Sequence, residues 1–445
     1  MLPSSPPVVP VSRLAQHVGE TVTVRGWLYN KRSTGKLHFL ILRDGSGWVQ
    51  AVASKADLAP EVWDAASELT QESSVIVSGL VKQDARAEGG VELAASDVRI
   101  VSLTRDYPIS KKEHGTAFLM EHRHLWLRSR RQHAILRVRS ELSRACRDYF
   151  FERDFVLVDS PILTPSSSEG TTTLFKTDFF DETAFLSQTG QLYLEPACQA
   201  LGKVFCFGPT FRAEKSKTRR HLAEFWMIEP EVAFATLPDI MDLAEDFVVT
   251  IVARMLDRCG EELKRLERDT KILDTVVKPF PRMHYDDAVK ILQASPPTSE
   301  EGGEPGAPFE WGRDFGGGDN TLLANRHDRP IMVHHFPMAV KAFYMKEDPL
   351  RPECALGVDV LAPEGYGEII GGGEREDDMA RLLRKIGEHG LDMRDYEWYL
   401  DVRRHGSVPH GGFGLGLERT LAWICGLAHV RESVPFPRMM GTLRP

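Results

Sequence analysis

Between Phe205 and Glu231 the chain reads as two apolar strands joined by a loop crowded with positive charge. Arg212 lies on the first strand, where a rigid guanidinium can hold a phosphate through two parallel hydrogen bonds. Phe225, on the second strand, offers a flat apolar surface on which a base can stack. One bound polyanion would satisfy both groups and the loop, whose positive residues are Lys215, Lys217, Arg219, Arg220 and His221.

The alternative is an exposed hairpin with a basic tip that faces water, which is the usual position of a charge run. That alternative explains less well why charges interrupt both strands, because burying a charge among apolar neighbours is costly. Side chains alternate along a strand, so the charges of each strand share one face. They are Arg212 and Glu214 on the first strand, and Glu229 and Glu231 on the second.

A second group of chemically suited residues lies between Gly357 and Glu376. Asp359 and Glu368 fall at the ends of neighbouring strands, and hard carboxylate oxygens beside a phosphate suit Mg²⁺. The glycines at 371–373 let a small ligand lie against the backbone, and Arg375 would then point into the same pocket.

A third stretch, His410–Leu427, is a glycine-rich turn that leads into a helix. Its spacing is GxGxG rather than the GxGxxG of dinucleotide-binding folds, and the tail after it is too short for a βαβ unit. The stretch is therefore not a dinucleotide-binding motif.

Composition limits what these groups can belong to. The chain has 445 residues, 42% hydrophobic and 27% charged, which predicts a globular protein of two or three domains. A net charge of −9 means that a polyanionic partner needs local basic patches. The cysteines are scattered without a CxxC pair, which argues against a zinc site or disulfides and fits a reducing cytoplasm. We expect residues 1–10 to be a loose tail rather than a signal peptide, and no apolar run is long enough to span a membrane.

The elements that must position these residues begin with a β-rich region. Alternating apolar residues predict strands across 21–52, 75–81 and 91–100, with a helix over 59–69. Five strands and one helix in this length predict a small OB-type barrel, a fold that often binds single-stranded nucleic acid. A purely structural barrel is an equally good interpretation of the strand pattern alone.

The central part of the chain reads as hinge, helix and strand. Residues 105–130 are irregular and basic, either a hinge that contacts RNA or a solvated linker. An amphipathic helix follows over 131–151, then a strand over 155–158 that leads to Pro161. A long helix is expected over 238–266.

Two later segments have bland default interpretations. Residues 295–319 are rich in Gly, Pro and acid, which is typical of a flexible surface insertion. A strand is predicted over 331–345 and carries His334 and His335. Such a pair is usually a satisfied core or turn pair, and without a further His or Cys cluster we do not expect it to bind a metal.

Taken together, these motifs resemble the class II aminoacyl-tRNA synthetases of the aspartyl, asparaginyl and lysyl subgroup. "FRAEKSKTRRHLAEF" resembles their motif 2, "GFGLGLER" their motif 3, and the helix and strand before Pro161 their motif 1. "GWLYNKRSTGKLHFLILRDGSGWVQAV" is similar to their anticodon-binding domain, so the resemblance covers nearly the whole chain.

The resemblance implies an ATP site and a metal site. Arg212 would hold the α-phosphate and Arg419 the γ-phosphate of a bent ATP, which makes them the catalytic residues. Mg²⁺ would be held by Asp359 and Glu368. The remaining ATP-binding residues that it implies are Glu214, His221, Phe225, Gly412, Gly414 and Gly416.

For the amino acid, the resemblance implies that Glu169 and Gln191 hold the ammonium group. Aspartyl enzymes carry a lysine at the position of Leu194, which pairs with the substrate carboxylate. A neutral amide needs one donor and one acceptor instead, which Arg375 and Glu229 can supply. This charge pattern selects asparagine over aspartate. One departure is "GGGERE" where "GGSQRE" is expected, which adds the charge of Glu374 near the pocket.

For the tRNA, the resemblance implies that Phe39 stacks on an anticodon base while Gln50 and Glu92 read the middle uridine. Phosphate contacts would come from a basic group near these positions, and the motif 1 helix implies a homodimer. The basic group is Arg25, Lys31, Arg32 and Lys36.

The fold expected is α+β, an N-terminal OB-type barrel followed by an antiparallel-sheet catalytic domain flanked by helices. The predicted domains are residues 1–104 (anticodon binding), 105–130 (hinge) and 131–445 (catalytic, with the insertion at 295–319). The implied reaction is ATP-dependent ligation of asparagine to tRNA(Asn) through an asparaginyl adenylate. Alternatives are a relaxed aspartyl-tRNA synthetase, an asparagine-synthetase-like enzyme and a non-catalytic RNA-binding relative.

Overall fold

The computed structural model describes residues 5–168, 174–216, 218–299 and 306–444. The chain divides into two compact units, residues 1–115 and 116–445, and the boundary falls inside the segment expected to be a hinge. Glu169 and Lys217 lie outside the described residues. In the part of the chain that the structure describes, every helix is too short or too polar to cross a membrane.

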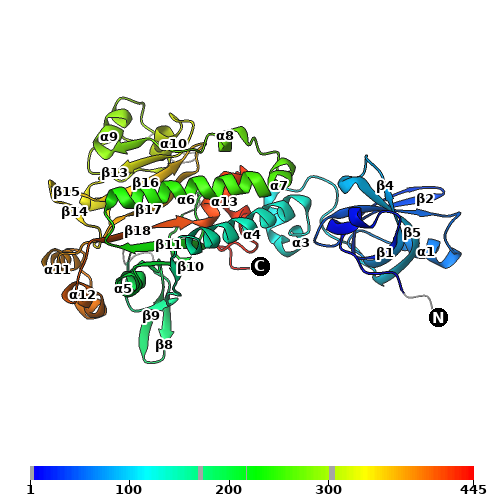
Figure 1. Ribbon diagram of the computed structural model, residues 1–445, viewed down its shortest axis with the longest axis horizontal. Helices are drawn as coiled ribbons and strands as arrows, with labels where there is room; N and C mark the ends of the chain where they lie inside the picture. The colour runs from blue at the N-terminus through cyan, green and yellow to red at the C-terminus, as the bar shows by residue number, and fades with distance from the viewer. Residues whose placement is uncertain (1–4, 169–173, 217, 300–305, 445) are drawn as a thin grey trace. The chain divides into compact units, whose positions relative to one another are not determined.

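The first unit is a closed five-stranded barrel with strand order β1-β2-β3-β5-β4, as the sequence predicted (Figure 1). Alternation along the strands sends Leu40, Leu42 and Leu93 inward to an apolar core and leaves the residues between them partly exposed. The helix expected over 59–69 is α1 (Pro60–Glu68). The strands are β1 (Thr21–Thr34), β2 (Leu37–Arg43), β3 (Trp48–Ser54), β4 (Ser74–Gln83) and β5 (Val91–Ser102).

The second unit is organised around an eight-stranded, mostly antiparallel sheet with order β12-β13-β16-β17-β18-β11-β10-β6. The charged segment identified in the sequence forms the β10–β11 hairpin, and the two glycine-rich segments form β17 and β18 beside it. The strands are β6 (Val156–Leu157), β10 (Lys203–Phe211), β11 (Glu224–Ala233), β12 (Arg282–His284), β13 (Ile331–His334), β16 (Gly357–Ala362), β17 (Gly367–Glu374) and β18 (His410–Gly416).

Three helices pack on one face of this sheet and form the main core with it (Figure 1). They are α4 (Arg130–Phe151), α6 (Leu237–Arg258) and α13 (Leu417–Cys425). Ser129 caps α4 through its hydroxyl, and the apolar stripe of that helix is buried as its periodicity predicted. The single helix expected over 238–266 is wrong: α6 ends at Arg258, and a separate short helix, α7 (Gly260–Arg265), follows after Cys259.

Two further expectations for this unit need correction. The strand predicted over 331–345 ends at His334, because His335 adopts a left-handed backbone with φ of 61° and a 3₁₀ turn follows at Met338–Val340. The described part of the 295–319 insertion is not a loose surface segment. Phe309 is buried against α9 (Tyr285–Gln293), and Gly317 begins α10 (Gly317–Ala324).

The remaining elements of the second unit are two small sheets and several further helices. Small sheets form from β7 (Leu163–Thr164), β8 (Lys176–Phe179) and β9 (Glu182–Leu186), and from β14 (Glu347–Asp348) and β15 (Arg351–Ala355). The other helices are α2 (Thr116–Glu121), α3 (Arg123–Trp126), α5 (Gln191–Leu201), α8 (Lys271–Asp274), α11 (Met379–Glu388) and α12 (Glu397–Arg404).

Candidate active site

Two cavities adjoin each other over the central strands of the large sheet. One has a volume of about 210 Å³ and is lined by the charged loop of the β10–β11 hairpin and by α13. The other has about 260 Å³ and is lined by the start of α5 and by β16 and β17. The residues that line both cavities are Arg212, Met227, Glu368 and Gly414. We call the first cavity the nucleotide cavity and the second the amino-acid cavity, after the ligands expected from the sequence.

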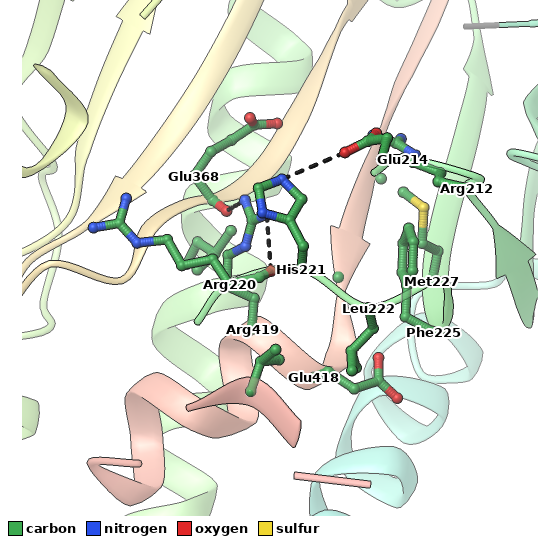
Figure 2. Close-up of a pocket in the computed structure, with 14 residues that line it drawn as sticks. Arg212, Glu214, Arg220, His221, Leu222, Phe225, Met227, Glu368, Glu418 and Arg419 are labelled. Carbon is green, nitrogen blue, oxygen red and sulfur yellow. Dashed lines mark hydrogen bonds and ion pairs between the residues drawn. The ribbon is translucent and has the colours of Figure 1, made fainter. Parts of the chain in front are cut away.

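Arg212 and Phe225 face each other in the nucleotide cavity (Figure 2). The guanidinium carbon of Arg212 lies 5.6 Å from the centre of the Phe225 ring, and the Arg212 N–H donates to Ala223 O at 3.0 Å across the hairpin. Both side chains are half-buried, so the cation and the aromatic face remain reachable from the cavity. A phosphate and a base can therefore be held a few ångströms apart.

His221 and Glu214 form the outer rim of the same cavity. Glu214 Oε2 lies 3.4 Å from His221 Nε2 (Figure 2). His221 Nδ1 also contacts the hydroxyls of Ser216, at 3.1 Å, and Thr218. Arg220 turns toward the insertion instead, where it donates to Gly317 O at 3.0 Å and to Thr321 Oγ1 at 2.9 Å. Arg219 is also held, donating to Gly365 O at 3.4 Å, so two arginines of the basic loop are tied to neighbouring segments.

Arg419 rises from the first turn of α13 into the nucleotide cavity. It donates to the backbone carbonyl of Glu368, and burial lowers the pKa of its guanidinium. The preceding residue, Glu418, points the other way, accepting from Trp226 N at 2.9 Å and pairing with Arg139 at 2.7 Å. Glu418 therefore connects α13 to the hairpin and to α4, while Arg419 lies in the nucleotide cavity.

The three glycines of the GxGxG motif lie on a strand, β18, rather than in the turn expected from the sequence. A Cβ on Gly412 would come within 2.0 Å of Pro230 O, and one on Gly414 within 2.2 Å of Met227 Cε. Gly414 and Gly416 line the nucleotide cavity. Gly412 does not line either cavity; its role visible here is to let β11 and the Glu231 side chain approach.

Asp359 and Glu368 converge from β16 and β17 over Gly371. A Cβ on Gly371 would lie 2.6 Å from Glu368 Oε1 and 3.6 Å from Asp359 Oδ1, so the missing side chain makes room for both carboxylates. A third carboxylate, Asp314 of the insertion, lines the same cavity. The donor set is all hard oxygen and fits Mg²⁺.

Lys341 partly balances this acidic group. Its Nζ donates to both oxygens of Asp359, at 2.9 and 2.8 Å, and lies 3.8 Å from the centre of the Phe336 ring. Burial, opposed by Lys341 and reinforced by Glu368, raises the pKa of Asp359 to about 7. Neither Asp314 nor Lys341 was singled out from the sequence, because only the fold brings the insertion and the 336–345 segment to β16.

Glu229 is buried at the inner end of the amino-acid cavity. It accepts from the hydroxyl of Thr189, from Gly190 N at 2.8 Å and from Cys206 Sγ at 3.3 Å. Gly190 is required here, because a Cβ would meet Cys206 Sγ at 2.7 Å. The loop before α5 is therefore built around this carboxylate.

Arg375 also lines the amino-acid cavity and is held by Glu231 in a bidentate pair. Its Nε and Nη2 donate to the two oxygens of Glu231, both at 3.0 Å. Burial works against the charge, but Glu231 raises the pKa of Arg375 above its usual range. The remaining terminal nitrogen, Nη1, is 3.5 Å from Met345 Sδ, so it is the donor left for a ligand.

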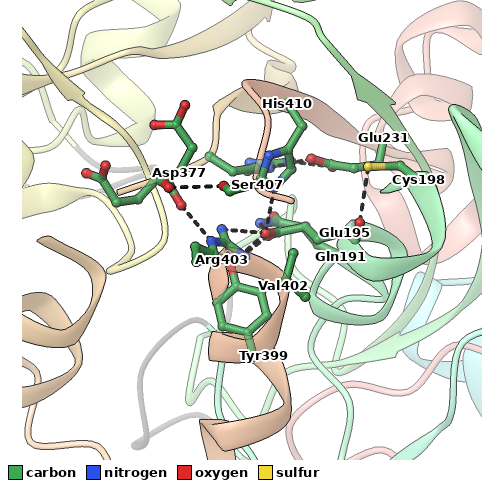
Figure 3. A network of polar contacts seen from close by, with 12 residues as sticks. Gln191, Glu195, Cys198, Glu231, Asp377, Tyr399, Val402, Arg403, Ser407 and His410 are labelled. Carbon is green, nitrogen blue, oxygen red and sulfur yellow. Dashed lines mark hydrogen bonds and ion pairs between the residues drawn. The ribbon is translucent and has the colours of Figure 1, made fainter. Parts of the chain in front are cut away.

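A buried polar network lies beneath these groups, centred on Glu195 of α5 (Figure 3). Its two oxygens accept from Gln191 Nε2 at 3.1 Å, Tyr399 OH at 2.7 and 2.8 Å, Arg403 Nη2 at 2.7 Å and His410 Nε2 at 3.0 Å. Although burial opposes ionisation, Arg403 and His410 lower the pKa of Glu195 well below its usual range. Glu195 is therefore a carboxylate that can only accept.

The other nitrogen of His410 also faces an acceptor, Val408 O at 2.8 Å. Because both neighbours of the ring accept, each ring nitrogen must carry a proton. Glu195, Glu231 and His410 each offer one possible metal-ligand atom, and these three atoms lie within 4.8 Å of one another. Two guanidiniums and this imidazolium already balance the carboxylates, so the group is an ion-pair network rather than a metal site.

Two residues discussed from the sequence face away from the amino-acid cavity. Leu194 is fully buried among Cys198, Val204 and Cys206 and does not line the cavity. Glu374 points to the opposite face of β17 from Arg375, where it accepts from Leu237 N at 2.7 Å and pairs with Lys346 at 3.4 Å. The carboxylate of Glu374 therefore contacts the start of α6 and Lys346, and it does not lie in the amino-acid cavity.

The barrel carries a separate candidate surface. Phe39, Gln50 and Glu92 all project outward from neighbouring strands β2, β3 and β5. Gln50 Nε2 donates to Glu92 Oε2 at 3.4 Å, and the guanidinium carbon of Arg32 lies 4.7 Å from the centre of the Phe39 ring. The fold therefore brings an aromatic ring, an amide, a carboxylate and a cation onto one face.

The His334–His335 pair has a third member that the sequence did not reveal. His284 lies opposite His334 in the β12–β13 register, and its ring is stacked 5.1 Å from that of His335. His334 Nδ1 and His335 Nδ1 are 2.6 Å apart, and neither ring lines the two cavities. Burial and the neighbouring rings lower the pKa of His334 to about 4.

Comparison with known proteins supports one family. The profile of the family described as tRNA synthetases class II (D, K and N) matches residues 116–440, and that of the OB-fold nucleic acid binding domain matches residues 22–101. The chain is 60% identical over 442 residues to the asparagine–tRNA ligase of Sorangium cellulosum, with 99% of each chain covered.

Solved structures give the same picture. The asparaginyl-tRNA synthetase of Pyrococcus horikoshii complexed with asparaginyl-adenylate is 43% identical, with a TM-score of 0.93 over 98% of this chain and 99% of that chain. A putative aspartyl-tRNA synthetase of Leishmania major is 25% identical, with a TM-score of 0.83 over 100% of this chain and 97% of that chain. The likeness to the asparaginyl structure is thus the stronger of these two.

Proposed function

The chain belongs to the asparagine–tRNA ligases within the class II tRNA synthetases, and we propose from that premise what each part of its site does. The enzyme joins asparagine to tRNA(Asn) with ATP, through an asparaginyl adenylate. The observation that carries the assignment of roles is the position of Arg212, which lines both cavities. The α-phosphate and the asparagine carboxylate must meet at such a junction.

Activation begins with ATP in the nucleotide cavity. Phe225 stacks on the adenine, Arg212 holds the α-phosphate, and Arg419 holds the γ-phosphate so that the pyrophosphate leaves on the side of α13. Glu214 and His221 position the nucleotide from the rim. As the carboxylate of asparagine attacks the α-phosphate, the fixed guanidinium of Arg212 stabilises the charge that develops there.

Asp359 and Glu368 are the residues that we assign to Mg²⁺, with Asp314 available beside them. Bound Mg²⁺ supplies charge stabilisation to the phosphate oxygens. The protein's own contribution is to hold the two carboxylates together over Gly371 and to fix the orientation of Asp359 through Lys341.

Asparagine is selected by a donor and an acceptor that face each other. Arg375 Nη1 donates to the side-chain oxygen of the substrate, and Glu229 accepts from its NH₂ group. Aspartate would bring a second negative charge toward the buried carboxylate of Glu229, where like charges repel strongly. Gln191 holds the substrate ammonium group, and so does Glu169, which lies outside the described residues.

The second step transfers asparagine from the adenylate to the terminal adenosine hydroxyl of the tRNA. The barrel contributes recognition: Phe39 stacks on an anticodon base, and Gln50 with Glu92 reads the middle uridine. The Phe39→Ala variant should weaken charging of tRNA by about 1–3 kcal/mol, as expected for a lost base stack, and leave asparagine activation without tRNA unchanged. Equal losses in both assays would remove the RNA-binding role from the barrel.

We also propose that the enzyme is a homodimer. β6 is an edge strand of the large sheet, and exposed apolar side chains cluster on and around it. An unpaired strand edge flanked by apolar surface favours pairing with a second copy. These side chains are Phe151, Val156, Leu157, Ile162 and Leu163. Sedimentation of an active monomer of 50.0 kDa would contradict the proposal.

The experiment that tests the assignment is ATP–pyrophosphate exchange with asparagine or aspartate at matched concentrations. We expect exchange with asparagine and a rate with aspartate that is lower by about 10⁴-fold, the discrimination that a site with a buried polar partner can reach. Equal rates with both amino acids would mean that Glu229 is not the discriminating residue and would favour the relaxed aspartyl enzyme.

A further inference from the structure

Gln191 stands between the amino-acid cavity and the buried network. It is the first residue of α5, it lines the cavity, and it is only 7% exposed. Its backbone N–H donates to Thr189 Oγ1 at 3.0 Å, which ties it to the loop that surrounds Glu229. One side of its amide faces Glu195, one helical turn further along α5.

The amide of glutamine can present either an acceptor or two donors to a ligand, because its oxygen and nitrogen ends exchange by a half-turn. An ammonium ligand requires the oxygen. In this structure the NH₂ end is directed to Glu195 Oε1 at 3.1 Å, which leaves Oε1 of Gln191 as the free end. A carboxylate cannot donate, so an ionised Glu195 allows only this orientation.

We infer that Glu195 is a positioning residue for amino-acid recognition: it fixes the Gln191 amide with its oxygen toward the substrate ammonium group. The inference rests on the proposed function of Gln191 and extends it to a residue that does not line either cavity. Glu195 binds no substrate itself. It acts by excluding the orientation of Gln191 in which an NH₂ group would face a positive charge.

The rest of the network explains how Glu195 can stay ionised and keep a fixed position. It is fully buried, and Tyr399, Arg403 and His410 donate to it from α12 and β18. His410 O also accepts from Arg375 N at 2.9 Å, so the network that fixes Gln191 is joined to the residue that holds the substrate side chain. Two ends of one amino-acid ligand are therefore oriented by one buried cluster.

The test uses the Glu195→Gln variant, which keeps size and hydrogen-bonding capacity but can donate as well as accept. Gln191 is then free to turn its NH₂ group toward the cavity. Binding of two probes is measured by calorimetry on the full-length enzyme: L-asparagine, and succinamic acid, which is asparagine without its amino group. We expect the variant to bind asparagine at least about tenfold more weakly, the loss of roughly one charge-assisted hydrogen bond. Binding of succinamic acid should change by less than about threefold.

A structural role would give a different pattern. If Glu195 only stabilised the fold, both probes and ATP would lose affinity together, and that result would overturn the inference. The Gln191→Ala variant supplies the second test: combined with it, Glu195→Gln should have no further effect on asparagine beyond about twofold. A full additional loss in the double variant would also overturn the inference.

Two further results keep the test decisive. If Glu195→Gln does not yield folded protein, Tyr399→Phe is used; it removes one donor to Glu195 and should weaken asparagine by about two- to fivefold, with succinamic acid unchanged. Equal weakening of both probes in that variant counts against the inference. If the wild type binds no asparagine at all, the proposed function fails instead, which separates the two failures.

Discussion

The nucleotide cavity and the amino-acid cavity adjoin at Arg212, yet they are built in different ways. The nucleotide cavity is lined mainly by partly buried side chains with local pairings, such as the His221–Glu214 pair at 3.4 Å. The amino-acid cavity rests on fully buried charges, and Glu195 alone has four partners there. The side chains of the nucleotide cavity are therefore held largely independently of one another, whereas those of the amino-acid cavity are linked by one network of buried hydrogen bonds and ion pairs.

This difference matches what each ligand asks of its site. ATP brings several negative charges, and mobile or exposed cations can neutralise them. Asparagine differs from aspartate by a single amide, so its site must hold a donor and an acceptor in fixed positions against a charge of the wrong kind. Coupled buried groups are not additive, and their loss should damage the fold as well as binding.

The largest effect should come from breaking the buried network. In Arg403→Leu, Glu195 loses a cation 2.7 Å away and stays in a fully buried site. We expect the free energy of unfolding of the second unit to fall by about 3–5 kcal/mol, the cost of leaving one partner of a buried pair. Denaturant unfolding followed by near-ultraviolet circular dichroism measures it.

The matched control is the next residue in sequence. Arg404 pairs with Asp401 at 2.7 Å, but its side chain is 47% exposed. Arg404→Leu should change stability by less than about 1 kcal/mol, as surface ion pairs do. Similar losses in both variants would show that the amino-acid cavity is no more coupled than the surface, and the contrast between the cavities would fail.

The next effect should appear in the nucleotide cavity and in the reaction rate alone. Arg419→Ala removes a charge-stabilising donor, so the barrier to asparagine activation should rise by about 2.7–4 kcal/mol, or roughly 10²–10³ in rate. Its hydrogen bonds within the protein go to two backbone carbonyls, Glu368 O and, at 3.5 Å, Arg220 O, so the free energy of unfolding should change by about 1 kcal/mol or less.

The conservative variant separates charge from shape. Arg419→Lys keeps the positive charge but loses the planar fork, and it should recover only part of the exchange rate. A rate near that of the wild type in Arg419→Ala would show that the γ-phosphate is held elsewhere. A large loss of stability in the same variant would instead show that the nucleotide cavity is coupled like its neighbour.

The same contrast decides how much the sequence could predict. The residues predicted for the nucleotide cavity lie in one hairpin and one short glycine motif, so strand alternation and residue type pointed to Arg212 and Phe225, and the resemblance of the glycine motif pointed to Arg419. The network could not be found in this way, because Glu195 meets Arg403 and His410 across 208 and 215 positions in sequence. Burial of a charge becomes visible only when the fold supplies its partners.

Smaller errors have equally local causes. Glu374 is the last residue of β17 and Arg375 follows it in an isolated β-bridge, so alternation alone places their side chains on opposite sides and keeps the charge of Glu374 out of the cavity. Asp314 was missed because the glycine- and acid-rich composition of the insertion is typical of a surface segment, whereas Phe309 and Phe315 pack it against α9. The barrel was predicted strand by strand, since its residues are nearly contiguous in sequence.

A smaller effect is expected at the rim of the nucleotide cavity. Glu214→Gln weakens the pairing with His221, and both side chains are partly exposed at 32% and 39%. The KM for ATP should rise about two- to fivefold, equivalent to about 0.5–1 kcal/mol for an exposed pair, with kcat for asparagine activation unchanged. His221→Asn in the Glu214→Gln background should add little. A loss as large as that of Arg419→Ala would show that the rim is part of the catalytic machinery.

The histidine cluster tests burial of polar groups without opposite charges. His334 and His335 share one hydrogen bond between ring nitrogens, so at least one ring must be neutral to accept it. The pKa of His334 is lowered to about 4 by burial and by its neighbours, from an ordinary value near 6.5. Charged groups around the cluster also act on the pKa values of His334 and His335: the arginines lower them and the aspartates raise them. These groups are Arg282, Asp286, Asp287, Asp348 and Arg351.

A pKa that is lower in the folded state than in the unfolded state means that the unfolded chain binds the proton more readily. The cluster therefore contributes stability that is fully present above about pH 6.5 and is lost as the pH falls toward about 4. Because His334 is only partly buried, solvent screening limits the effect to about 1 kcal/mol or less. The measurement is the free energy of unfolding of wild type and His334→Gln between pH 7.5 and 4.5, with the exposed His405→Gln as the control. The difference between wild type and His334→Gln should shrink as the pH falls through this window, and a difference independent of pH would show that buried polar groups here are not sensitive to charge.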